Sequence, residues 1–195
     1  MDVADFWRFV ERSADAESDP NRRALWLEDR LSRIALTHVV DFQIHLDAAR
    51  RPIDTYDMWA AANQIMDGLC SGDSFWYFQT WLIGQGRRWW QHAARHPDNL
   101  VELPAMQALA GSQPGEWEDA AWPHWEQLAC VASNAYDRVT GEEEGIDDAL
   151  LDRGHIRPFD PRPDGVPWDS DSLAAISQRL PRLSRVFPRR RYTKP

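Results

Sequence analysis

The chain lacks, or has little of, several sequence features from which a protein's class is often recognised. Cys70 and Cys130 are its only cysteines, and Lys194 is its only lysine. Two cysteines are too few for a disulfide framework or a zinc cluster, so we expect two reduced thiols in a cytoplasmic protein. No apolar run reaches the roughly 18 residues that a transmembrane helix needs. The N-terminus has acids in place of the apolar core of a secretory signal, so no membrane association is expected.

Common catalytic signatures are missing as well. The sequence has no Walker loop, dinucleotide-binding glycine motif, nucleophile elbow or kinase motif. His92 and His96 have the spacing of zinc-binding helices, but Ala93 stands where a metalloprotease has glutamate. His38 and His45 share a helix face, where they are either core histidines or a base or metal-ligand pair. The sequence therefore predicts no metal and no cofactor.

Length and charge limit the domain organisation and the partners that remain possible. A chain of 195 residues that is 43% hydrophobic suits one globular domain, which we place at residues 1–187. The net charge of -9 makes nucleic acid an unlikely partner, because an acidic surface repels phosphates. The strongly basic end is interpreted as a tail over residues 188–195.

Apolar spacing of three and four residues predicts helices along most of the chain. The sequence favours an all-α fold, a single irregular helical bundle with Pro/Gly-rich loops toward the C-terminus. Asp2 is expected to cap the first helix and Ser71 the fourth, and Asp169 or Ser170 the last. The expected helices begin near residue 2, cover 20–50 as one long helix or two, and then cover 54–68, 71–96, 104–110, 125–140 and 170–180, with an irregular segment at 152–168.

The stretch from 69 to 90 is the most informative part of the sequence. It contains four of the 11 tryptophans, together with cysteine, aspartate, tyrosine and arginine. Aromatic rings bury large areas, so this density indicates either the centre of a core or the wall of a pocket.

With these residues in view, the chain resembles a bacterial family known as domain-of-unknown-function family 4240. Phe6-Trp7 resembles the family's opening helix. Its central signature is matched by Cys70-Ser71, Asp73, Phe75, Tyr77-Phe78, Trp81-Leu82-Ile83 and Gly86-Arg87. The family usually has two adjacent acids after the Cys-Ser pair, but here Gly72 takes the first place. The resemblance implies no particular reaction.

The polar residues of this signature are the candidate site. Asp73, Tyr77 and Trp81 recur every four residues and so share one helix face. A cysteine just before a helix N-terminus, as Cys70 is, can have a lowered pKa and act as a nucleophile. In a pocket floored by Trp76, Asp73 would serve as anchor or base. Otherwise Asp73 only supports the helix start and the aromatic rings are core.

Two functions remain open. The first is a binding module whose aromatic-lined cleft around the fourth helix holds a small molecule, a peptide or a partner protein. The alternative is an enzyme of undescribed type, such as one that tailors natural products or peptides. It would use Asp73 with Cys70, Tyr77 or a histidine such as His45, and Arg87 would clamp an anion. The region from Trp117 to Trp125 is either a lid over this cleft or a loop pinned to the body.

Overall fold

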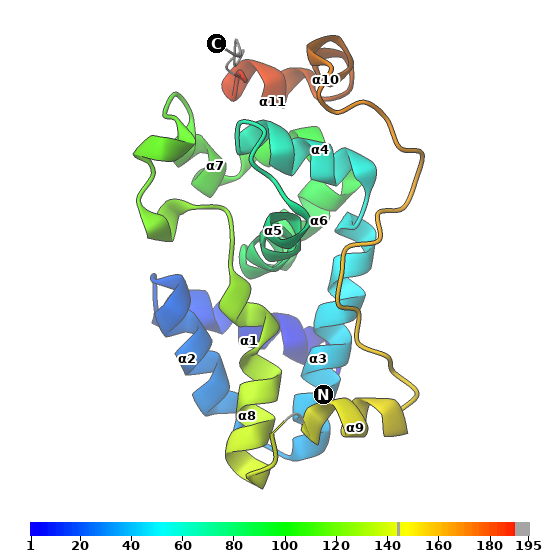
Figure 1. The fold of residues 1–195 in the computed structure, drawn as a ribbon. Coiled ribbons are helices and arrows are strands. Elements are labelled where there is room, and N and C mark those ends of the chain that lie inside the picture. The colour runs from blue at the N-terminus through cyan, green and yellow to red at the C-terminus, as the bar shows by residue number, and fades with distance from the viewer. Residues whose placement is uncertain (144, 190–195) are drawn as a thin grey trace.

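The computed structural model describes residues 1–143 and 145–189, and these residues form an assembly of helices (Figure 1). Within them no strand forms, and the only β-type pairing is an isolated bridge between Thr55 and Asp164. The all-α prediction is confirmed. No helix in the described ranges has the length and apolar character to cross a membrane.

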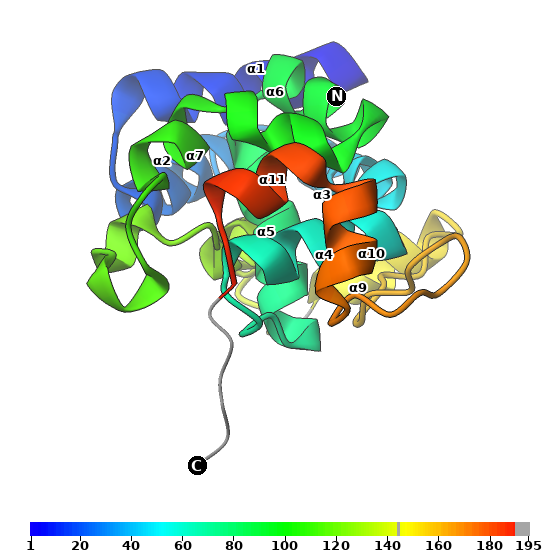
Figure 2. The same cartoon turned by 90° about the horizontal axis from the view of Figure 1, so that it is seen from above.

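The helices occupy two halves of the molecule, joined by one long helix (Figure 1). The lower half of that view contains α1 (Val3–Ala16), α2 (Pro20–Leu31), α8 (Val131–Thr140) and α9 (Gly145–Asp152), and α3 (Leu36–Arg50) rises from it. Figure 2 shows the upper half from above. Its helices are α4 (Tyr56–Ile65), α5 (Gly72–Gly84), α6 (Arg87–Arg95), α7 (Pro104–Leu109), α10 (Leu173–Arg179) and α11 (Pro181–Val186).

Short 3-10 turns connect several of these helices and complete the path of the chain. They are η1 (Arg51–Ile53), η2 (Pro97–Glu102), η3 (Pro114–Glu116), η4 (Asp119–Ala121) and η5 (Glu126–Ala129).

Side-chain caps account for where the helices begin. The Asp2 carboxylate accepts a hydrogen bond from the backbone N–H of Asp5 at 2.8 Å, and the Asp5 carboxylate accepts from the N–H of Asp2 in return. Ser71 Oγ accepts from the N–H of Ser74 at 3.1 Å. Both satisfy a backbone donor that a helix start leaves free. The predicted caps Asp2 and Ser71 are confirmed, whereas α10 is capped by Ser172 and not by Asp169 or Ser170.

Several predicted boundaries were wrong. The helix expected over 71–96 is interrupted after α5, because Gly86 has a φ of 90°, a left-handed conformation that ends the helical path. A new helix, α6, begins at Arg87. The helix expected from Trp125 is a 3-10 turn followed by α8. The long second element is two helices, α2 and α3, which was one of the two predicted forms.

The segment from 153 to 171 has no helix, as predicted for its proline and glycine content, and runs up the right side of Figure 1. Several contacts attach it to the body, two of them to acidic residues near the end of α3 and just before α4. His155 Nε2 lies 2.8 Å from Asp47 Oδ2, and the backbone N–H of Arg162 donates to Asp54 Oδ2 at 2.8 Å. Of the predicted basic tail, Pro188 and Arg189 are described, and residues 190–195 lie outside the described residues.

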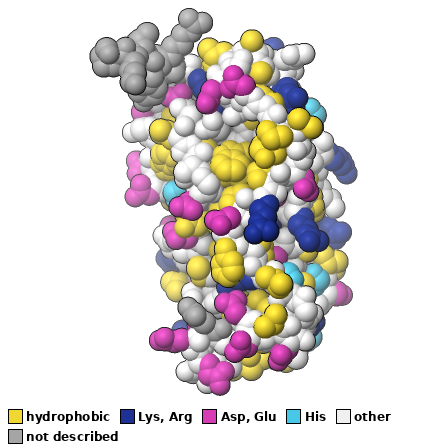
Figure 3. Space-filling view, turned by 45° about the vertical axis from the view of Figure 1, so that its right-hand side comes forward, with side chains coloured by type: hydrophobic (Ala, Val, Ile, Leu, Met, Phe, Trp, Pro, Cys, Tyr) yellow, Lys and Arg dark blue, Asp and Glu magenta, His cyan; other side chains and the backbone are white. Residues whose placement is uncertain are grey.

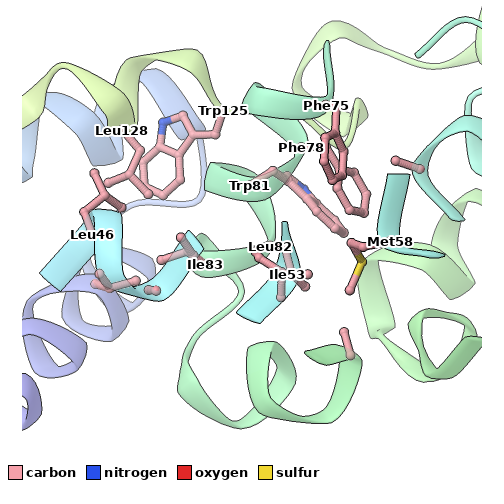
Figure 4. Packing of buried hydrophobic residues seen from close by; sticks show 14 of the residues in the cluster. Leu46, Ile53, Met58, Phe75, Phe78, Trp81, Leu82, Ile83, Trp125 and Leu128 are labelled. Carbon is pink, nitrogen blue, oxygen red and sulfur yellow. The ribbon is translucent and has the colours of Figure 1, made fainter. Parts of the chain in front are cut away.

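The aromatic helix α5 lies at the centre of the packing. Figure 4 shows its side chains between those of α3 and η5 on one side and those of η1 and α4 on the other. Buried hydrophobic residues from Phe6 to Phe187 form one cluster. Gly84 allows η5 to approach, since a Cβ there would lie 2.5 Å from the Trp125 ring. The central position of α5 therefore depends on a residue without a side chain.

Candidate functional site

The predicted row of Asp73, Tyr77 and Trp81 on α5 lies in two different environments. Asp73 is exposed in the first turn. Tyr77 donates its hydroxyl proton to Glu126 Oε1 of η5 at 3.0 Å. Burial, and then the Glu126 carboxylate, raise the pKa of Tyr77. At the end of the row, Trp81 is only 6% exposed and packs on Phe78 with ring centroids 5.4 Å apart. One end of the row is therefore solvated and the other is core.

Trp76, the proposed floor of the pocket, is already covered by another side chain. The guanidinium carbon of Arg50 lies 3.4 Å from the centroid of the Trp76 ring. Arg50 is buried, and this burial lowers its pKa to about 9. Such a cation over an aromatic face is attractive when it is removed from water. The pair supports the junction of α3 with α5.

Cys70 does not have the environment of an activated nucleophile. It is 9% exposed, and burial raises the pKa of its thiol to about 12. Its Sγ donates to the Ser71 carbonyl at 3.8 Å. The helix N-terminus therefore does not offset desolvation here, and the thiol stays protonated near neutral pH.

The last two candidates lie beside other elements. Arg87 is exposed at the start of α6, and its backbone N–H donates to Glu11 Oε1 at 3.0 Å. His45 Nε2 donates to the Met1 carbonyl at 3.2 Å, next to the ring of Phe6. The structure thus does not gather the seven candidates in one place, and a ligand site at α5 stays a prediction.

The other histidines and the tryptophan loop have separate partners. His92 Nε2 lies 2.8 Å from Glu102 Oε2, whereas His96 Nδ1 accepts from the N–H of Asp98. In the part of the chain that the structure describes, no three His, Cys, Asp or Glu side chains form a group able to hold a metal. Trp125 is buried, and its backbone N–H donates to the Tyr77 carbonyl at 3.0 Å. These contacts favour a loop pinned to α5.

A different concave surface combines aromatic rings with charge. It lies between α1 and α2 and has a volume of about 460 Å³. Ligand pockets typically have volumes of about 300–1,000 Å³. We call it the arginine groove and define it by its lining residues: Asp5, Arg8, Phe9, Arg12, Trp26, Arg30, Arg33 and Ile34.

Helical spacing explains how this groove forms. Asp5, Arg8, Phe9 and Arg12 are three or four residues apart and so share one face of α1. Trp26, Arg30 and Arg33 follow the same spacing along and just after α2, which packs against α1. Phe9, Trp26 and Ile34 are half-buried against the core. The result is an apolar floor with guanidinium groups around it.

The charges of the groove are only partly neutralised. Arg8 Nη2 lies 2.5 Å from Asp5 Oδ1, and Arg33 Nη2 lies 2.6 Å from Asp29 Oδ1. The hydrogen bond from Arg33 lowers the pKa of Asp29. Two cations remain. Within residues 1–143 and 145–189, Arg12 and Arg30 have no ion pair, although Arg30 lies 5.4 Å from the Trp26 ring centroid.

The sequence interpretation did not identify this groove. In the first helix it used only the cap residue Asp2 and the Phe6-Trp7 pair of the family resemblance. The available signal was an arginine at each of two successive turns, Arg8 and Arg12, beside a half-buried Phe9. Each row alone is typical of a solvated helix face. The two rows meet only because α1 and α2 fold back on one another.

Comparison with known proteins places the chain in a family. The family model described as "Protein of unknown function (DUF4240)" matches residues 1–138. This match covers well over half of the chain, so the chain belongs to that family, as the central signature suggested. No curated protein and no solved structure matches it. The arginine groove lies entirely within the matched residues.

Proposed function

We propose that this DUF4240 member is a binding domain, and that the arginine groove holds an anionic ligand with a flat or apolar part. One observation carries the proposal. Four arginines and one aspartate line an apolar floor, giving the groove a formal charge of +3 (four minus one) in a chain whose net charge is -9. A carboxylate or phosphate suits the guanidinium groups, and a ring suits Phe9 and Trp26.

The free arginines are the main support for this proposal. Guanidinium groups bind carboxylate and phosphate oxygens with two parallel hydrogen bonds, provided that their donors are not already used. Arg12 and Arg30 are exposed and, among the described residues, have no ion pair. They are therefore available to a ligand without breaking an ion pair.

A binding role also agrees better than catalysis with the surroundings of the α5 candidates. An enzyme needs titratable groups that converge in a site protected from water. Asp73 is exposed, Cys70 is a protonated buried thiol, and Arg87 lies at the start of the next helix. The proposal therefore moves the binding site from α5 to α1 and α2.

The test compares two probes that differ in charge. Naphthalene-1-acetate has a ring and a carboxylate, whereas naphthalene-1-acetamide has the same ring and no charge. Titration calorimetry should show that the carboxylate binds at least about tenfold more tightly, the size expected for one charge-assisted hydrogen bond. The double variant Arg12→Gln/Arg30→Gln should remove most of this preference. Equal binding of both probes to the wild-type protein would refute the proposal.

Arg87→Gln is the matched control. Its side chain is also exposed, and the substitution removes one positive charge where the groove variant removes two, but Arg87 does not line the groove. We expect this variant to bind the carboxylate as the wild type does. If Arg87→Gln abolished binding while the groove variant retained it, the site would lie at α5–α6 and the anion clamp of the alternative interpretation would be favoured.

A further inference from the structure

The opposite side of the molecule carries a surface that complements the arginine groove. Helix α9 buries Ile146 and Leu150, and its other side faces solvent. On that side Asp148, Leu151 and Asp152 are three and four residues apart, so they form one exposed patch. Leu151 is 62% exposed, so its side chain is accessible to a partner. We call these three residues the α9 patch.

The α9 patch has charges that are available to a partner. Asp147 already lies 3.7 Å from Arg157, but Asp148 and Asp152 have no ion pair in the described part of the chain. Figure 3 shows acidic side chains gathered at the lower end of the molecule, the end at which α9 lies in Figure 1. The patch therefore presents two carboxylates on either side of an apolar side chain.

The spacing of the charged residues on the α9 patch matches that on α1. Asp148 and Asp152 are four residues apart, about 6 Å along a helix axis, as are Arg8 and Arg12 on α1. Leu151 lies between the two carboxylates, and Phe9 lies between the two arginines. A helix that lies along α1 in the groove can therefore place one carboxylate at Arg12, which is unpaired among the described residues, and Leu151 at Phe9. The other carboxylate replaces Asp5 as the partner of Arg8.

The two surfaces of one copy cannot meet each other. Helix α8 packs against both α2 and α9, and Figures 1 and 2 place α2 and α9 on opposite sides of the molecule. We propose that the α9 patch of one copy binds the arginine groove of a second copy of this chain. This inference rests on the proposed function, since it names the partner of the same groove.

Such a contact joins different surfaces of the two copies. Each bound copy keeps one groove and one patch free, so association continues to rings or open chains. Charged groups at an exposed contact mainly provide steering and specificity, so the association should weaken as salt increases.

The experiment uses two variants of the full chain. Arg12→Gln/Arg30→Gln neutralises the groove and leaves the patch, whereas Asp148→Asn/Asp152→Asn neutralises the patch and leaves the groove, so the two altered surfaces do not attract each other. Sedimentation velocity at low salt should show association of the wild type above its 22.6 kDa monomer mass. Each variant alone should remain a monomer. A mixture of the two should form a one-to-one dimer and nothing larger, because only one intact groove and one intact patch remain.

Glu142→Gln/Glu143→Gln is the control, because it makes the same change in net charge as the patch variant near the same end of the molecule. It should associate as the wild type does. The inference is overturned if the wild type stays monomeric, if either variant alone still associates, or if the mixed variants stay monomeric. A monomeric wild type that still prefers naphthalene-1-acetate through Arg12 and Arg30 would refute self-association and leave the proposed function standing.

Discussion

Gly84→Ala tests the packing on which the central position of α5 depends. An alanine Cβ at this position would lie 2.5 and 2.6 Å from two carbons of the Trp125 ring. Trp125 is 2% exposed, and its carbonyl accepts from Thr80 Oγ1 at 2.6 Å. The ring has little freedom to move, because Arg23 lies 4.4 Å from its centroid. Overpacking of a core costs about 1–3 kcal/mol, while replacing glycine in a helix recovers about 0.5–1 kcal/mol.

The difference of these two effects spans about 0–2.5 kcal/mol, and from the middle of that range we expect the free energy of unfolding to fall by about 1–2 kcal/mol. For a chain of this size, that corresponds to a Tm lower by about 2–8 °C. Gly72→Ala is the control, since a Cβ there meets nothing within 4 Å and the residue begins the same helix. Its Tm should stay unchanged or rise. An unchanged or higher Tm for Gly84→Ala would mean that the Trp125 loop moves away easily, as a lid does.

Three further predictions concern the α5 region. Trp81→Ala should lower the free energy of unfolding by about 3–5 kcal/mol in urea denaturation, because the ring is 6% exposed; a near-wild-type midpoint would contradict a core role. Asp73→Ala should cost at most about 1 kcal/mol, because the residue is exposed and only its charge near the helix N-terminus is lost; a loss of naphthalene-1-acetate binding in a stable variant would favour the original site. Cys70 should react slowly with iodoacetamide at pH 8. A pKa of about 12 instead of 9.0 lowers the thiolate fraction about a thousandfold, and higher nucleophilicity recovers only about thirtyfold. Mass spectrometry should find Cys70 modified at least about thirtyfold more slowly in the folded than in the urea-unfolded protein. Because the folded pKa is raised, the stability from this protonated thiol is complete below about pH 9 and is lost as the pH rises toward about 12.

The sequence predicted the fold class and the starts of α1, α2, α5 and α7 because those depend on local physics. Apolar spacing identifies a helix, and a capping side chain such as Asp2 or Ser71 determines where it starts. The break at Gly86 was missed because glycine is compatible with both a continued and an interrupted helix. Here Gly86 lies against the Glu11 side chain, which also accepts from the next N–H. That contact comes from α1, more than 70 residues away.

Helix α9 was missed for a different reason. It has only eight residues and follows a run of acids, which by itself is typical of a solvated turn. Its stability comes from burial of Ile146 and Leu150 against neighbouring helices, and short helices depend on such contacts. Sequence periodicity over two turns does not separate this case from a loop.

The candidate site was harder to predict than the fold, because a site is a relation between elements. The row from Asp73 to Trp81 does follow one helix, but the elements packed around α5, among them η5 and α4, leave Asp73 solvated and bury Trp81. Arg8, Arg12 and Arg30 instead look like ordinary surface charges until α1 and α2 are packed together. The dense aromatic stretch of the sequence therefore turned out to be core. The groove is recognised only in the structure, from its concave shape and from arginines that are unpaired within the described ranges.

The net charge of the chain also conceals what its surfaces can bind. A value of -9 argues against a phosphate backbone as a partner, because such a ligand extends over much of the surface. At physiological salt, charges more than about 8 Å away are screened, so a ligand in the groove responds mainly to the local charge. That charge is +2 (four arginines minus Asp5 and Asp29) when Asp29, the ion-pair partner of Arg33, is counted with the lining residues. Added salt should weaken the binding of both the small anion and the α9 patch of a second copy, so salt dependence does not distinguish these two ligands. A competition experiment does test whether they share one site. If the carboxylate and the second copy both use Arg12 and Arg30, naphthalene-1-acetate should compete with self-association, and its neutral amide should not. Failure of the carboxylate to dissociate the assembly would place the contact between copies outside the groove.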